Sequence, residues 1–99
     1  MSHHAFILLA LLMRLDLFLK ASRLCPRRTV AQELCEAGAV SVNGGQAKPA
    51  RVVRLGDEIT LRRRNRLLTV RVIALPSARQ TSRSESATLY EITADTPSE

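Results

Sequence analysis

The sequence is short of aromatic side chains, and this shortage excludes a class of function. Its 99 residues include only three aromatics, Phe6, Phe18 and Tyr90, and no tryptophan. Folds that bind single-stranded nucleic acid by stacking bases need several aromatic rings on one surface, so this mode of binding is excluded. A chain of this length forms one domain that buries about 60–65% of its unfolded surface, too little for a cofactor fold beside a substrate domain.

Histidine and cysteine are equally scarce, which leaves little for catalysis or metal binding. The two histidines, His3 and His4, are adjacent, and we interpret them as a chance doublet, with a metal pair as the alternative. The two cysteines, Cys25 and Cys35, are ten residues apart, with no CxxC motif and no histidine nearby. That spacing is typical of packing thiols in a reducing cytosol. We therefore expect no enzyme activity, no catalytic residue, no metal and no cofactor.

Long apolar runs are limited to residues 5–13. A membrane-spanning helix needs about 20 residues, so this run is too short to cross a bilayer. It also lacks the preceding basic residues and the following small-residue site of a secretory signal. We interpret residues 1–13 as an extension of the first helix, or as extra translation from an upstream start codon, with Met13 as the native start. We expect a cytoplasmic protein with no membrane partner.

Basic residues outnumber acidic ones, and this excess indicates the class of partner. There are 15 Lys and Arg against 9 Asp and Glu, and 13 of the 15 bases are arginine. The planar fork of arginine matches phosphate oxygens two at a time, so nucleic acid is the leading partner. Residues 14–71 contain 13 bases and five acids, a charge of +8, so the positive charge belongs to the predicted folded module.

Two short amphipathic helices are predicted at the start of this module. Apolar residues recur at helical spacing over residues 14–23 and, after the interruption at Pro26, from residue 28 or 29 to 37. Asp16 complements the positive N-terminus of the first helix, and Gly38 ends the second. Helices this short are not stable alone, so we expect them to pack on each other and on later segments.

After Gly38 the apolar period changes to two, which predicts strands. Residues 40–42 lead into Asn43-Gly44, a strong signal for a tight turn, and Gly45 marks a predicted bulge. Residues 58–62 and 66–75 also alternate and predict a hairpin around residues 63–65.

Turn-forming residues predict the organisation of the C-terminal part. Residues 76–86 are rich in Ser, Arg and Thr and predict a mobile loop. A short strand at residues 88–92 is then expected to return to the sheet edge before an acidic tail. The predicted organisation is an extension (1–13), a domain (14–75) and a loop, strand and tail (76–99).

Three clusters of basic residues are candidates for RNA contact. Arg27 and Arg28 begin the second helix, and Arg23 ends the first. Cations at a helix N-terminus oppose the helix dipole at about 0.3–1 kcal/mol each, so we expect an anion to bind there. The alternative is a solvated surface with accidental charge.

The other two clusters lie later in the chain. The second consists of Lys48, Arg51 and Arg54, near the Asn43-Gly44 turn. The third consists of Arg62, Arg63, Arg64 and Arg66, on the predicted hairpin. Arginines on a hairpin also protect an exposed strand edge from aggregation, and this remains the alternative for the third cluster.

The order of helix, basic turn, helix, glycine, strand and Asn-Gly turn resembles the RNA-binding domain first named for ribosomal small-subunit protein four, here the S-four domain. The likeness covers residues 14–72 and is carried by SRLCPRRTVA, GAVSVNG and LGDEI. The resemblance implies a small α+β fold of the S-four (alpha-L) type, with two short helices packed on a small, mostly antiparallel sheet.

A narrower likeness involves RLDLFLK, SRLCPRRT and SESATLYEIT. These segments are similar to the bacterial ribosome-associated heat-shock RNA-binding proteins and the RqcP factors of ribosome quality control. This resemblance implies a monomer that binds large ribosomal subunit RNA and peptidyl-tRNA after translation stalls. It also implies a partner, the tail-elongating quality-control factor, which adds alanine to the stalled chain. The alternatives are a ribosomal RNA-binding assembly or structural protein and an RNA-binding fragment of a pseudouridine synthase or tRNA synthetase.

The resemblance also implies which residues contact RNA. Its main contacts fall on Arg14, Asp16 and Arg28. The full predicted set is Arg14, Asp16, Lys20, Arg23, Arg27, Arg28, Lys48 and Arg51. Arg14 and Lys20 are six residues apart on roughly opposite sides of a helix, so we do not expect both to contact one ligand.

Overall fold

The computed structural model describes residues 13–76 and 82–97, which form three helices and seven strands. In chain order these are β1 (Met13–Arg14), α2 (Leu15–Ala21), α3 (Arg28–Glu36), β2 (Val40–Val42), β3 (Gly45–Gln46), β4 (Val52–Val53), β5 (Glu58–Arg63), β6 (Arg66–Val72), α4 (Arg83–Ala87) and β7 (Tyr90–Pro97).

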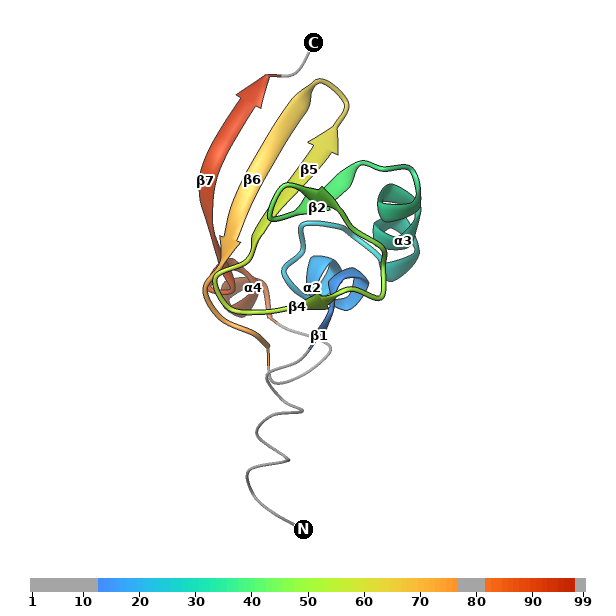
Figure 1. Cartoon of the computed structure of the whole chain (residues 1–99). Coiled ribbons are helices and arrows are strands. Elements are labelled where there is room, and N and C mark those ends of the chain that lie inside the picture. The colour runs from blue at the N-terminus through green and yellow to red at the C-terminus, as the bar shows by residue number, and fades with distance from the viewer. Residues whose placement is uncertain (1–12, 77–81, 98–99) are drawn as a thin grey trace.

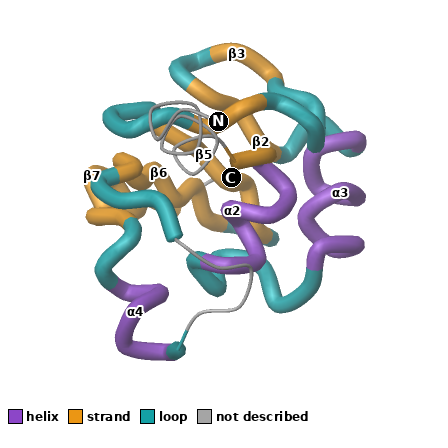
Figure 2. Tube along the Cα trace, turned by 90° about the horizontal axis from the view of Figure 1, so that it is seen from below, coloured by secondary structure: helices purple, strands orange, loops and turns teal. Residues whose placement is uncertain are grey.

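The strands form one antiparallel sheet and one short ribbon. The sheet has the order β3-β2-β5-β6-β7, and β1 pairs separately with β4. The helices α2 and α3 pack against each other beside β2, while α4 lies near the start of β7 (Figures 1 and 2). The predicted α+β class, with two short helices packed on a mostly antiparallel sheet, is confirmed.

The first two helices form where the apolar spacing predicted them. Leu15, Phe18 and Leu19 of α2 are fully buried and lie on one face of the helix. At the end of α3, Gly38 adopts a φ of +77° and donates its N–H to the carbonyl of Cys35, 3.1 Å away. The N–H of the following residue bonds to the carbonyl of Leu34, so the helix closes with a Schellman motif.

The Asn43-Gly44 turn forms as predicted, and its register is regular. Asn43 and Gly44 have φ values of +52° and +85°, which fit a type I′ turn between β2 and β3. Val42 pairs directly with Gly45, so the bulge predicted at Gly45 is wrong. The side-chain oxygen of Asn43 also accepts a 2.9 Å hydrogen bond from the N–H of Glu58, which ties this turn to β5.

The C-terminal part differs from the prediction. Residues 83–87 form α4 where a loop was predicted, because Ser82 caps the helix by accepting a 3.1 Å hydrogen bond from the N–H of Glu85. Strand β7 runs to Pro97, five residues beyond the predicted end, because it pairs with the whole of β6, from Val72 to Arg66. The rest of the predicted loop, residues 77–81, lies outside the described residues.

Both cysteines are free and buried in the core, which confirms their interpretation as packing thiols. Burial raises the pKa of Cys25, and burial together with the nearby Cys25, Asp16 and Glu36 raises the pKa of Cys35 to about 11. Neither thiol is therefore a reactive nucleophile near neutral pH.

Candidate RNA-binding surface

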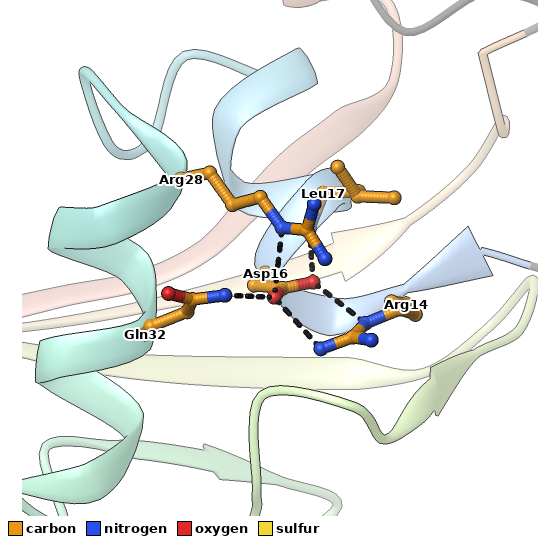
Figure 3. A network of polar contacts seen from close by, with 5 residues as sticks. All are labelled: Arg14, Asp16, Leu17, Arg28 and Gln32. Carbon is orange, nitrogen blue, oxygen red and sulfur yellow. Dashed lines mark hydrogen bonds and ion pairs between the residues drawn. The ribbon is translucent and has the colours of Figure 1, made fainter.

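The centre of the candidate site is the carboxylate of Asp16, in the first turn of α2 (Figure 3). One carboxylate oxygen accepts hydrogen bonds from the N–H of Leu17 at 2.8 Å and from Nε of Arg14 at 3.2 Å. The other accepts from Nη2 of Arg14 at 3.1 Å, Nε of Arg28 at 3.1 Å and Nε2 of Gln32 at 3.0 Å. One acidic group therefore joins the start of α2 to the first two turns of α3.

The carboxylate of Asp16 is ionised although it is buried. Burial opposes ionisation, but hydrogen bonds from Gln32, Arg28 and Arg14 outweigh it and hold the pKa of Asp16 below its usual value. Two cations and one anion leave the cluster with a net charge of +1. The buried acid thus fixes the two arginines and still leaves an attraction for anions.

Arg14 and Arg28 present part of their guanidinium groups outward. Their side chains are 44% and 41% exposed, whereas the side chain of Asp16 is fully buried. Within the described ranges, Nη1 of Arg14 and both Nη atoms of Arg28 have no hydrogen-bond partner. These atoms carry N–H donors in a fixed orientation, which suits phosphate oxygens.

The N-terminus of α2 is closed by the chain segment that follows β3. The N–H of Leu15 bonds to the carbonyl of Arg51 at 2.7 Å, and the N–H of Asp16 bonds to the carbonyl of Pro49 at 3.1 Å. Arg14 also pairs with Val52 in the β1–β4 ribbon. The segment that carries the second basic cluster therefore lies against Arg14, although more than thirty residues separate them.

The link between α2 and α3 carries the remaining basic residues of the first cluster. Arg27 is the N-cap of α3, its side chain is exposed, and the first turn of α3 contains no acid. Arg23 is exposed and has a left-handed φ of +61°. Its Nε donates a hydrogen bond to the hydroxyl of Ser86, 3.2 Å away, so α4 helps to hold this link.

The structure brings most of the predicted site residues together, but not all of them. Arg14, Asp16 and Arg28 form one network, with Lys48 and Arg51 on the adjacent segment. Lys20 lies in the last turn of α2, at the opposite end of that helix from Arg14. Asp16 has no exposed surface, so its place is behind the two arginines rather than at the surface.

Two residues that hold the predicted contact residues in place, Gln32 and Ser86, are not in the set predicted from the sequence. Gln32 follows Arg28 by four residues, so helical spacing already placed both on one face of α3. Ser86 gave no comparable signal, because its partner Arg23 is 63 residues away. The one local signal for the helix that carries Ser86 is the capping pattern of Ser82 with Glu85 three residues later.

The third basic cluster lies at the tip of the β5–β6 hairpin. Strands β5 and β6 are the third and fourth of the five, but β2 pairs only with Ile59, Thr60 and Leu61, so the end of β5 that carries Arg62 and Arg63 extends beyond its neighbour. Arg66 pairs with Asp95 of β7 at 2.8 Å. In residues 13–76 and 82–97, no carboxylate lies within ion-pair distance of Arg62, Arg63 or Arg64.

The described part of the chain holds no group of three or more acidic, histidine or cysteine side chains that is able to bind a metal ion. His3 and His4 lie outside it. None of the helices described is both long enough and apolar enough to cross a membrane.

Comparisons with known proteins agree with the sequence motifs. Residues 13–59 match the model of the S4 domain, which is the S-four domain that the motifs resemble. The chain is 48% identical over 86 residues to the RQC P-site tRNA stabilizing factor of Halalkalibacterium halodurans, an alignment that covers 86% of this chain and 94% of that protein. It is also 48% identical over 80 residues to the factor of the same name from Bacillus subtilis, covering 81% and 91%.

A solved structure gives the same result for the fold. Heat shock protein 15 of Vibrio cholerae, determined as a trimer, matches with a TM-score of 0.77 and 35% sequence identity, over 84% of this chain and 83% of that one. The resemblance seen in the sequence motifs is therefore confirmed by both sequence and structure.

Proposed function

Because this chain belongs to the family of S4-domain RNA-binding proteins that includes the RQC P-site tRNA stabilizing factors and heat shock protein 15, we propose that it binds the large ribosomal subunit together with peptidyl-tRNA. One observation supports this most directly: Arg14 and Arg28 are both fixed by the buried Asp16 and both keep outward N–H donors. This arrangement binds phosphate oxygens of folded RNA without stacking on bases.

The proposed binding mode has a main contact and supporting contacts. Arg14 and Arg28 bind phosphates directly, Asp16 orients both arginines, and Gln32 holds Asp16 in place. The supporting contacts come from Lys20, Arg23, Arg27, Lys48 and Arg51. Because arginines held in place lose less conformational entropy on binding than free ones, the buried acid increases affinity despite its negative charge.

The proposed role is rescue of stalled translation in the cytoplasm. The protein acts as a monomer without enzyme activity of its own and holds peptidyl-tRNA on a large subunit left by a stalled ribosome. A tail-elongating partner factor then adds alanine to the nascent chain. The names of the relatives support the tRNA part of this proposal, since they are described as stabilising tRNA in the P site.

Sucrose-gradient sedimentation of cell extracts tests the role. After translation is stalled, we expect the full-length protein in the fractions of free large subunits that retain tRNA. An Arg28→Ala variant should leave those fractions, whereas Arg83→Ala, which removes an exposed arginine of α4, should remain in them. Even distribution over all ribosomes would instead support a structural or assembly protein and contradict the rescue role.

A reconstituted reaction tests the finer claim. Purified large subunits with peptidyl-tRNA, alanyl-tRNA and the tail-elongating factor should add more alanine when the protein is present. Equal addition with and without it would contradict the proposed part in alanine tailing, while leaving the ribosome binding measured by sedimentation intact.

A further inference from the structure

A groove lies between α3 and the hairpin of β5 and β6, apart from the Asp16 network. Its volume is about 670 Å³. The apolar lining comes from Pro26, Val30, Leu34 and Leu68, and the arginines of the hairpin border it. A groove of this size accommodates several side chains of a bound segment.

The groove and the Asp16 network use different faces of α3. Arg28 and Gln32, four residues apart, point to Asp16. Val30 and Leu34, also four apart, line the groove and are offset from the first pair by two residues. Because each residue turns an α-helix by about 100°, an offset of two places the pairs on roughly opposite faces. A ligand in the groove therefore leaves the Asp16 network accessible.

The charge around the groove is positive and unneutralised. Arg62, Arg63 and Arg64 line it, and among the residues described none of the three has an ion-pair partner. The one acid in the lining, Asp95, is paired with Arg66. The groove thus combines an apolar floor with three cations that have no counter-charge among residues 13–76 and 82–97.

We propose that this groove binds an acidic amphipathic segment of a partner protein. Apolar side chains of the segment cover Val30, Leu34 and Leu68, and its carboxylates pair with Arg62 and Arg64. A phosphate backbone would satisfy the arginines but would bring no aliphatic side chains to the floor, so the lining favours protein over RNA. One small domain then has an RNA-binding side and a protein-binding side.

Peptide selection on the full-length protein tests the proposal. A phage-displayed library of random peptides of about 16 residues, roughly four helical turns, is selected at physiological ionic strength. We expect enriched peptides to combine acidic residues with apolar residues three and four positions apart. Their affinities are then measured by fluorescence anisotropy on the wild type and on the variants.

Two groove variants and two matched controls make the test specific. Val30→Gln should weaken the selected peptides about tenfold, as expected for the loss of one buried valine contact. Ile92→Gln, at an exposed apolar residue of β7 outside the groove, should not. Arg64→Glu should also weaken binding, whereas Arg83→Glu, with the same change in net charge, should not. If Val30→Gln lowers the melting temperature, the test depends on Arg64→Glu, because Arg64 lies in an exposed turn outside the core.

Several outcomes would overturn the proposal. These are a failure to enrich peptides, enrichment of peptides without acidic residues, or equal affinity for the wild type and the groove variants. Binding of ribosomal RNA that depends on Val30 would assign the groove to RNA, and self-association that depends on Val30 would assign it to a second copy. Since the proposed ribosome binding depends on Arg28, its failure is measured separately with Arg28→Ala.

Discussion

The guanidinium of Arg23 and the hydroxyl of Ser86 are joined by a 3.2 Å hydrogen bond across 63 residues of sequence. Ser86 is only 2% exposed, and its hydroxyl also lies 2.8 Å from the carbonyl of Ala21, to which it donates. This serine therefore connects α4 to the end of α2 and to the basic link that follows it. The position of Arg23 depends on a residue near the other end of the chain.

Ser86→Ala should destabilise the fold and weaken RNA binding. Loss of a buried hydroxyl that donates one hydrogen bond and accepts another should lower the free energy of unfolding by about 1 kcal/mol, measured by urea denaturation. RNA affinity, measured by fluorescence anisotropy well below the denaturation midpoint, should fall several-fold because Arg23 loses one support. Thr96→Ala, which removes an exposed hydroxyl of β7 away from α4, is the control. If the Ser86→Ala variant binds RNA with unchanged affinity, the position of Arg23 does not contribute to RNA binding.

Asp16→Asn should weaken RNA binding although it makes the protein more positive. The amide cannot hold Arg14 and Arg28 by charge, so both arginines become more mobile, and the free energy of unfolding should fall by about 1–3 kcal/mol. Glu36→Gln, at an exposed residue of α3, makes the same change in charge away from the network. A model based on net charge alone predicts tighter RNA binding for both variants. Tighter binding by Asp16→Asn would therefore refute the positioning role.

Arg28→Ala should reduce both RNA affinity and its dependence on salt. Loss of one phosphate contact should decrease the slope of log K against log salt concentration by about 0.7–0.9. Arg28→Lys should recover the slope, because it keeps the charge, but not the full affinity, because it loses the planar fork. Binding isotherms over a range of salt concentrations measure both. An unaltered slope in Arg28→Ala would remove Arg28 from the phosphate contacts.

Acid should destabilise the wild type through Asp16. The hydrogen bonds in the folded state place its pKa below the ordinary value of 3.8, so the folded state binds this proton less readily than the unfolded state. Its contribution to stability is complete well above pH 3.8 and is lost as the pH falls below that value through the folded pKa. The free energy of unfolding should therefore decrease less with acid in Asp16→Asn than in the wild type. Parallel acid profiles would contradict this assignment.

Local signals in the sequence predicted much of the fold. The apolar spacing of Leu15, Phe18 and Leu19, the stop at Gly38 and the Asn43-Gly44 turn each depend on residues within a few positions of one another. Such signals determine the type of element because backbone conformation responds mainly to neighbouring side chains. They also revealed the first basic cluster and its place between two helices.

Contacts between distant residues were not visible in the same way. The carbonyls of Pro49 and Arg51 close the N-terminus of α2, and Ser86 supports Arg23, yet neither relationship leaves a periodic pattern in the sequence. Composition alone also gave a wrong prediction for residues 82–87. These polar residues are typical of a loop, but Ser82 caps them and residues 83–87 form α4. The position of Asp16 behind the arginines likewise required the packing of α2 on α3.

Because α3 contacts Asp16 on one face and lines the groove on the other, its length is constrained as well as its residues. A residue inserted between Val30 and Ala31 would rotate the rest of the helix by about 100° and shift it by about 1.5 Å. Gln32 would then lose its register with Asp16, and Leu34 would leave the groove. Substitutions are able to alter one face and spare the other, but an insertion or deletion changes the phase of both. We therefore expect this helix to tolerate changes of residue far better than changes of length.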